Sequence, residues 1–166
     1  MKKDNIILIG MPGVGKSTIG VILAKEIGYQ FVDTDLLIQQ QEKRLLKEII
    51  AEEGLEGFLQ IENQVNVGIA AERSIIATGG SVVYGREAMA HLSSIGTVIY
   101  LHCSYAILSA RLGNLKNRGV VLREGQTLRD IYEERSRLYE QYADIIIRED
   151  DLGIEATLQL ILDKLS

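Results

Sequence analysis

The sequence predicts an α/β fold in which a five-stranded parallel sheet carries helices on both faces. Five short runs are almost entirely apolar, and segments with helical spacing of apolar residues lie between them. Strands without polar alternation are typical of parallel sheets covered on both faces, and their alternation with helices favours that arrangement. The five predicted strands are Asn5–Ile9, Tyr29–Val32, Ser74–Ala77, Thr97–Leu101 and Asp144–Ile147.

The first predicted helix follows the first strand and has apolar residues four positions apart, at Ile19, Leu23 and Ile27. Gly28 comes directly after it and is the expected C-cap. A later helix is predicted over Thr127–Tyr142, with Thr127 as its N-cap. The last helix is predicted from one apolar stripe, which consists of Ile154, Leu158, Ile161, Leu162 and Leu165.

Length and composition indicate a single soluble domain over residues 1–166. The chain is 46% hydrophobic and 25% charged, and its size allows a core without metal or disulfide support. A net charge of −5 predicts no basic surface for nucleic acid or an anionic membrane. The single Cys103 cannot form an internal disulfide and is expected in the core, and no apolar stretch has the length of a membrane span. We therefore expect a cytoplasmic monomer without nucleic-acid or membrane partners.

A phosphate-binding loop is predicted directly after the first strand, where residues 10–17 have the sequence GMPGVGKS. This segment fits G-x-x-x-x-G-K-[ST], in which glycines let backbone N–H groups converge on phosphate oxygens at a helix N-terminus. Lys16 can reach the β- and γ-phosphates without contacting the core, and the Ser17 hydroxyl can bind Mg²⁺. The motif predicts a three-layer sandwich of the P-loop nucleoside triphosphatase type. The expected nucleotide-binding residues are Gly13, Val14, Gly15, Lys16, Ser17 and Thr18.

Two carboxylates follow the second predicted strand, in the sequence FVDTD over residues 31–35. Strand alternation would place Asp33 and Asp35 on one face, at the edge of the sheet where the phosphate loop lies. One carboxylate could assist Mg²⁺ and the other could orient or deprotonate an acceptor hydroxyl. The alternative is that Asp35 only caps the following helix.

Gly79 and Gly80 follow the third predicted strand at the same edge of the sheet. Paired glycines there would let a substrate approach the backbone, although a tight turn alone would also need them.

A polar, basic stretch from Arg111 onwards predicts a lid over about 113–125, with a solvated basic loop as the alternative. Of Arg135 and Arg137 on the next helix, only one can face the cleft, and spacing does not choose between them. The acidic run 149–151 is expected to be a solvated turn that caps the last helix.

Six segments in this order resemble the shikimate kinase family, which are small P-loop kinases. They are GMPGVGKS, DTD, GFLQIE, ATGGS, ARL…NRG and ERSRLY before ADIII. The resemblance extends from Ile6 to the last helix, and the order of all six segments is much more specific than the phosphate loop alone. It implies transfer of phosphate from ATP, with Mg²⁺, to shikimate, which gives shikimate 3-phosphate in aromatic amino acid biosynthesis.

For the nucleotide, the resemblance implies that Lys16 and Ser17 hold phosphates and Mg²⁺ and that Asp33 lies near the metal. Arg118 resembles the lid arginine that reaches the transferring phosphate. Arg111 resembles the arginine that lies over adenine.

For the acceptor, the resemblance implies that Asp35 binds the hydroxyl groups and acts as the base. Gly79 and Gly80 resemble the backbone contacts to the acid substrate. The family pattern R-x-P-L-Y selects Arg135, and not Arg137, as the arginine that binds the carboxylate.

The chain departs from the family where the pattern G-F-R-x-x-E has an arginine that binds the shikimate carboxylate. Leu59 occupies that position here, and loss of one charge-assisted partner weakens binding by about tenfold to a hundredfold. Ser81 replaces a third glycine, Gly-Val-Val follows Arg118 in place of Pro-Leu-Leu, and a proline is missing near Gly153.

Three hypotheses about function follow. The first is a shikimate kinase, and the second is a related kinase for another small acceptor, such as a sugar acid or a neutral polyol, which Leu59 favours. The third is a nucleotide-binding module without catalysis. The presence of the five residues with implied chemical roles argues against it; they are Lys16, Ser17, Asp33, Asp35 and Arg118.

Overall fold

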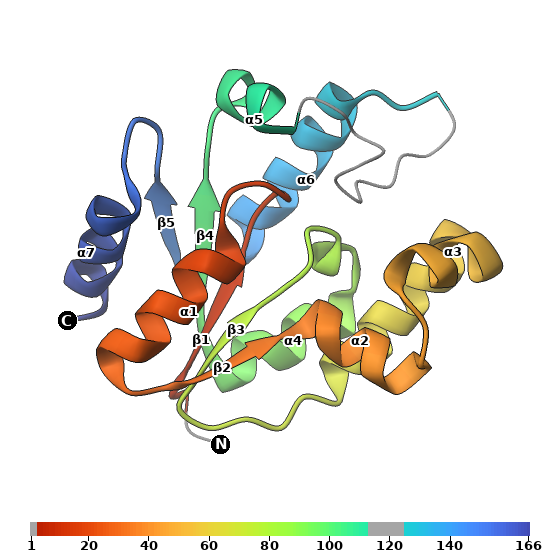
Figure 1. The fold of residues 1–166 in the computed structure, drawn as a ribbon, viewed down its shortest axis with the longest axis horizontal. Helices are drawn as coiled ribbons and strands as arrows, with labels where there is room; N and C mark the ends of the chain where they lie inside the picture. The colour runs from red at the N-terminus through yellow and green to blue at the C-terminus, as the bar shows by residue number, and fades with distance from the viewer. Residues whose placement is uncertain (1–2, 113–124) are drawn as a thin grey trace.

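A computed structural model of the chain describes residues 3–112 and 125–166. The described residues form one five-stranded sheet with helices around it (Figure 1). In chain order, the elements are β1 (Asn5–Ile9), α1 (Lys16–Ile27), β2 (Gln30–Asp33), α2 (Thr34–Glu42), α3 (Leu46–Val67), β3 (Ser74–Ala77), η1 (Val82–Tyr84), α4 (Arg86–Ile95), β4 (Gly96–His102), α5 (Tyr105–Leu112), α6 (Leu128–Tyr142), β5 (Ile145–Arg148) and α7 (Ile154–Leu165).

The strands are parallel and lie in the order β2-β3-β1-β4-β5, which confirms the predicted fold class. Every residue of β1 is buried, and Ile7 pairs with Ile76 of β3 on one side and Val98 of β4 on the other. The outer strands β2 and β5 are only partly covered, so the prediction of full burial is wrong for them. They are less buried because an edge strand has a neighbour on one side only.

The helices form layers on the two faces of this sheet. Figure 1 shows α1 and α7 on the near face and α4 and α6 on the far face. The α2–α3 pair extends beyond the β2 edge and has its own small core, which consists of Ile38, Ile49, Phe58 and Val65. Helix α3 is kinked at Gly54, and its second half packs against α4 and η1.

The strand order places a crevice at the carboxyl end of β1. The chain leaves β1 towards β2 on one side, and β4 and β5 are added on the other, so the connections diverge at this point. Ligands of parallel α/β sheets bind at such a switch point, beyond the carboxyl ends of the strands. The segments after β1, β2 and β3 therefore meet at one rim.

Two predicted helix caps, Gly28 and Thr127, are confirmed. Gly28 caps α1 in a left-handed conformation, and its N–H donates to the Ala24 carbonyl. Thr127 caps α6 in a reciprocal capping box with Asp130. The apolar stripe of α7 is correct for its middle, but Ile154 is 48% exposed and lines a cavity in place of joining the core.

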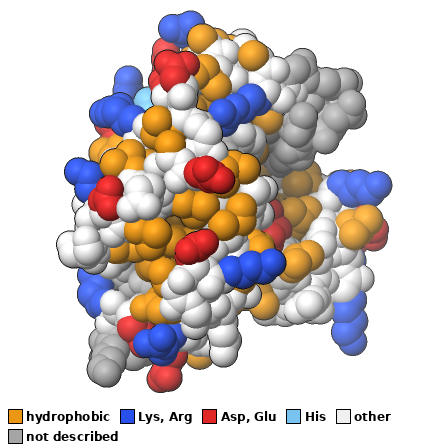
Figure 2. All heavy atoms as spheres, turned by 60° about the vertical axis from the view of Figure 1, so that its left-hand side comes forward, with side chains coloured by type: hydrophobic (Ala, Val, Ile, Leu, Met, Phe, Trp, Pro, Cys, Tyr) orange, Lys and Arg blue, Asp and Glu red, His pale blue; other side chains and the backbone are white. Residues whose placement is uncertain are grey.

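Charged side chains of both signs share the face at the left of Figure 1, where they lie among apolar side chains (Figure 2). This mixture is consistent with a chain of 18 basic and 23 acidic residues. Within residues 3–112 and 125–166, no helix is both long and apolar enough to cross a bilayer. The predicted lid, with Arg118, lies outside the described residues apart from Gly125.

The turn after β1 depends on the absence of a side chain at Gly10. Its φ is +147°, and a Cβ atom there would lie 2.7 Å from the Leu101 carbonyl oxygen of β4. We expect Gly10→Ala to lower the free energy of unfolding by about 2–4 kcal/mol, because strain and overlap add. Urea denaturation measures this change.

Gly28→Ala is the matched control for this prediction. Gly28 also has a positive φ, +73°, but an added Cβ would meet nothing within 4 Å. We expect it to lose only about 1 kcal/mol, from backbone strain. Equal losses in the two variants would contradict the close approach of Gly10 to β4.

Candidate active site

The phosphate loop connects β1 to α1 and is held together by Lys16. The Lys16 ammonium donates hydrogen bonds to the carbonyls of Gly10, at 2.7 Å, and Met11, at 2.9 Å. Lys16 is only 8% exposed, and its ammonium is buried against the backbone of the loop. Burial lowers the pKa of Lys16 to about 8, and the charge of Asp35 opposes that shift. Lys16 is still mostly protonated at pH 7 and can attract phosphate.

Asp33 connects the first turn of α2 to the phosphate loop. Its Oδ1 accepts hydrogen bonds from the N–H groups of Asp35, at 2.9 Å, and Leu36, at 3.3 Å, so Asp33 is the N-cap of α2. Its Oδ2 accepts a hydrogen bond from Ser17 Oγ at 3.3 Å. The alternative of a helix cap is therefore realised, but by Asp33 and not by Asp35.

Asp35 reaches the rim from a helix and not from a strand. Because β2 ends at Asp33, the alternation argument for two carboxylates on one strand face is wrong. Asp35 lies in the first turn of α2, within electrostatic reach of Lys16. Burial raises the pKa of Asp35, the nearby Asp33 raises it further, and Lys16 lowers it.

Gly79 and Gly80 lie where side chains from several elements converge. A Cβ on Gly79 would lie 2.8 Å from Asp35 Oδ1 and 2.9 Å from Glu62 Oε2. A Cβ on Gly80 would lie 2.7 Å from Pro12 Cδ and 3.1 Å from Arg135 Nη1. The two glycines therefore leave room for carboxylates, an arginine and the phosphate loop to meet at the backbone.

The structure distinguishes Arg135 from Arg137. Arg135 is 4% exposed and its guanidinium lies 5.5 Å from the centre of the Tyr84 ring, whereas Arg137 is exposed. Arg135 Nε is buried and has no hydrogen-bond partner among the described residues. Because its Nη1 is the atom close to Gly80 and its Nε lacks a partner, this guanidinium could bind an anionic ligand.

Glu62 is a site residue that sequence reasoning did not identify. It lies on α3 and is 2% exposed; its Oε1 accepts a hydrogen bond from Ser81 Oγ at 2.6 Å. Its Oε2 is buried without a partner among the described residues and is close to Gly79. Burial raises the pKa of Glu62 to about 7; Asp35 raises it as well, while Ser81 and Arg135 lower it. The sequence did offer one indication of this burial. Phe58 and Glu62 are four residues apart, which places both on the same face of the helix, and that face is buried.

Leu59 lies on α3 one turn before Glu62. Residues three positions apart in a helix are neighbours on its surface, so a cation at position 59 could reach the Glu62 carboxylate. Leu59 offers an apolar, half-buried side chain instead. Arg135 is the cation that acts on Glu62 in the described part of the chain.

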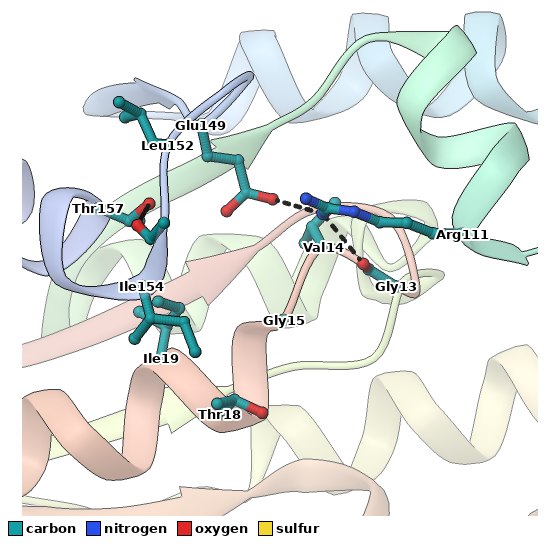
Figure 3. A pocket seen from close by; sticks show the side chains of 11 residues that line it. Gly13, Val14, Gly15, Thr18, Ile19, Arg111, Glu149, Leu152, Ile154 and Thr157 are labelled. Carbon is teal, nitrogen blue, oxygen red and sulfur yellow. Dashed lines mark hydrogen bonds and ion pairs between the residues drawn. The ribbon is translucent and has the colours of Figure 1, made fainter.

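A cavity of about 210 Å³ lies beside the phosphate loop (Figure 3). It is bounded by the loop and start of α1, by the end of α5 and by the segment between β5 and α7. Arg111 Nη1 donates hydrogen bonds across it to Gly13 O, at 3.3 Å, and Glu149 Oε1, at 3.2 Å. Glu149 is buried, so the expected solvated turn that caps α7 is wrong at this residue; Gly153 is the N-cap.

The residues near Ser17 fit a magnesium ion. A hydroxyl and a carboxylate are hard oxygen ligands, which Mg²⁺ prefers, and Mg²⁺ takes its other ligands from phosphates and water. No group of three or more His, Cys, Asp or Glu side chains suited to a metal occurs in residues 3–112 and 125–166. A nucleotide would therefore have to supply part of the coordination.

The family model for shikimate kinase matches residues 12–166 of the chain. Among curated proteins, shikimate kinase 2 of Yersinia pseudotuberculosis serotype O:3 (strain YPIII) is 33% identical over 170 aligned positions, which cover 95% of each chain. Shikimate kinase of Trichormus variabilis is 41% identical over 146 positions, which cover 86% of this chain and 80% of that one.

Solved structures of similar fold carry the same family name. Shikimate kinase from Acinetobacter baumannii in complex with shikimate has a TM-score of 0.87 and 29% identity, over 98% of this chain and 92% of that chain. Shikimate kinase from Aquifex aeolicus has a TM-score of 0.84 and 28% identity, over 97% and 95% of the two chains.

The burial of Glu62 predicts a pH-dependent stability. Folding raises the pKa of Glu62 from 4.5 to about 7, so the folded state binds a proton that the unfolded state releases in this window. The free energy of unfolding therefore falls as the pH rises from 4.5 through 7, by up to about 3 kcal/mol. Glu62→Gln removes this loss, and its stability relative to wild type is expected to increase from pH 4.5 to pH 8. Urea denaturation of both proteins across that range measures the difference, and a constant difference would contradict a buried neutral Glu62.

Proposed function

The chain belongs to the shikimate kinase family, and we propose that it transfers the γ-phosphate of ATP to a hydroxyl group of shikimate. The observation that carries this proposal is the convergence at Gly79 and Gly80, where Asp35 and Arg135 meet the phosphate loop. Each of these groups suits one part of the reactants. The Asp35 carboxylate suits the acceptor hydroxyl, the Arg135 guanidinium suits the acceptor carboxylate, and Lys16 suits the phosphates of ATP.

ATP is proposed to bind along the phosphate loop with its base in the cavity beside Arg111. Backbone N–H groups of the loop and the N-terminus of α1 would bind the phosphate oxygens. Lys16 would exchange its bonds to two carbonyls for bonds to the β- and γ-phosphates, where negative charge develops during transfer. Arg118 remains the predicted lid arginine for the transferring phosphate.

Mg²⁺ is proposed to bind beside Ser17 and Asp33. The Ser17 hydroxyl would be a direct ligand, and Asp33 Oδ2 would bind the ion directly or through water. When bound, the ion neutralises charge on the β- and γ-phosphates.

On the acceptor side, Asp35 is proposed as the base. The acceptor hydroxyl oxygen forms a bond to the γ-phosphorus, the bond from that phosphorus to the β–γ bridging oxygen breaks, and the hydroxyl proton passes to Asp35. ADP retains the electron pair of the broken bond. Arg135 would bind the acceptor carboxylate, and the backbone of Gly79 and Gly80 would contact the ring substituents.

Leu59 favours one second candidate, a kinase for another small hydroxylated compound such as a sugar acid or polyol. An assay that couples ADP release to a colour change, run with shikimate, quinate, gluconate and nucleoside monophosphates, distinguishes the candidates. We expect shikimate to give the fastest turnover. Faster turnover of another compound would make that compound the assigned acceptor in place of shikimate. No turnover of any compound would support the non-catalytic hypothesis.

A cytoplasmic location and a monomeric state stay predictions from the sequence.

The role of Asp35 predicts a selective loss of turnover. Asp35→Asn keeps the size of the side chain but removes the base, so kcat is expected to fall by about a hundredfold or more. The KM for ATP is expected to change little, because the phosphate loop is intact. Steady-state kinetics at pH 7 measures both constants. An unchanged kcat would exclude Asp35 as the base.

The absence of a cation at Leu59 predicts weak binding of the acid substrate. Leu59→Arg would place a cation one helical turn before Glu62, and we expect it to lower the KM for shikimate by roughly tenfold, the effect of about 1.4 kcal/mol. Gln60→Arg adds the same charge at an exposed neighbouring position and is expected to leave that KM unchanged. If Leu59→Arg had no effect while another acceptor were used well, the shikimate assignment would fall and the kinase assignment would stand.

A further inference from the structure

Glu149 is a buried carboxylate in the wall of the nucleotide cavity. It follows β5 directly, and its N–H donates to the His102 carbonyl of β4 at 3.0 Å, so the sheet fixes its backbone. Its side chain is 5% exposed, while that of its partner Arg111 is 41% exposed. A rigid, desolvated anion thus holds a long side chain that reaches out from the end of α5 (Figure 3).

The charge of Glu149 opposes the binding of a triphosphate. Its field reaches Lys16 and raises the pKa of that ammonium, so it also acts on phosphates bound there. Burial raises the pKa of Glu149 itself, and Arg111 lowers it. A negative group at this place is unfavourable for phosphate binding, and its benefit has to come from its contact with Arg111.

The contact with Glu149 uses one edge of the guanidinium. Among residues 3–112 and 125–166, the hydrogen bonds of Arg111 go to Glu149 and to Gly13 O, and Nη1 donates both. Guanidinium N–H bonds lie in the plane of the group, so an Arg held by one edge can still stack its flat face on an aromatic ring. Pairing with Glu149 also compensates the charge of Arg111, which suits contact with an uncharged base better than contact with phosphate.

We propose that Glu149 is a positioning residue for the nucleotide, whose carboxylate holds Arg111 by one edge so that the guanidinium face stacks on the base of ATP. The inference rests on the proposed function, because it takes ATP as the ligand of this cavity. Anchoring Arg111 before ATP binds reduces the conformational entropy that the side chain loses on binding.

The test compares a ligand that has a base with one that lacks it. Calorimetric titration with Mg-ATP and with Mg-tripolyphosphate gives two dissociation constants for each protein, and their ratio isolates the contribution of the nucleoside. Glu149→Gln is expected to weaken Mg-ATP by about threefold to tenfold, the range of a lost guanidinium–ring contact. Tripolyphosphate is expected to bind the variant as tightly as wild type or more tightly, because a repelling charge is gone. In turnover, the KM for ATP is expected to rise while kcat at saturating ATP is retained.

Asp151→Asn is the matched control. Asp151 lies in the same turn, is exposed and has a positive φ of 62°, which asparagine also adopts. This variant removes an equal charge two residues from Glu149 and is expected to leave the ratio of the two dissociation constants unchanged. In an Arg111→Ala background, Glu149→Gln is expected to change the ratio no further, because Glu149 acts through Arg111.

An unchanged ratio in Glu149→Gln, or equal tightening of both ligands, would overturn the inference, since Glu149 would then act only through its charge. If that variant does not fold by circular dichroism, Arg111→Lys is measured in its place. It keeps a cation for Glu149 but loses the planar group, so an unchanged ratio there overturns the inference as well. Failure of the proposed function looks different, because it shows in wild type, which would then fail to turn over shikimate or to bind Mg-ATP at all. The ratio of dissociation constants is read from binding alone and does not depend on the acceptor.

Discussion

The Lys16 ammonium is a buried cation held by the carbonyl oxygens of Gly10 and Met11, and the rest of the rim depends on it. Desolvation lowers the pKa of Lys16 to about 8, and the charge of Asp35 opposes that shift, so Lys16 is mostly protonated at pH 7. Its hydrogen bonds to the two carbonyls close the phosphate loop around the position that phosphate is proposed to take. Asp35 stabilises the charged form of this buried lysine, apart from any part it has in proton transfer.

Two acids and one arginine share the acceptor side, and their charges are coupled. Burial raises the pKa of Glu62 to about 7, Asp35 raises it as well and Arg135 lowers it, so Glu62 changes its charge near pH 7. An ionised Glu62 would attract Arg135 and repel a substrate carboxylate, whereas a neutral Glu62 would do neither. Leu59, on the adjacent turn, is uncharged. Position 59 therefore supplies no second cation that could pair with Glu62 or bind the substrate carboxylate. The substitution thus changes the electrostatics of Glu62 as well as the contacts available to the acceptor.

The sequence was sufficient for the features that depend on local chemistry. Apolar runs predicted all five strands to within one residue at each end, and the glycine and lysine spacing predicted the phosphate loop. The roles of Asp33 and Asp35 were less accessible, because a strand that ends at Asp33 and not later changes the geometry of both carboxylates. Burial of Glu62 and Glu149 depends on packing between elements distant in sequence. The spacing from Phe58 was an indication for Glu62, whereas nothing in the acidic run 149–151 distinguishes Glu149. Helical spacing alone did not separate Arg135 from Arg137. The family pattern selected Arg135, and the packing of α6 against η1 accompanies the burial of that residue.

Direct packing joins the nucleotide side to the acceptor side. Gly80 lies against Pro12 of the phosphate loop, and the Tyr139 hydroxyl donates to the Gly80 carbonyl while contacting Met11 Sδ at 3.7 Å. Tyr139 is fully buried, so this contact cannot yield without disturbing α6, which also carries Arg135. If acceptor and phosphate bind as proposed, this rigid centre of the rim would determine the distance between them. Leu59 lies on α3 and Glu149 follows β5, and neither takes part in these contacts, so a change at either position can alter the binding of one reactant and leave the residues proposed for the other in place.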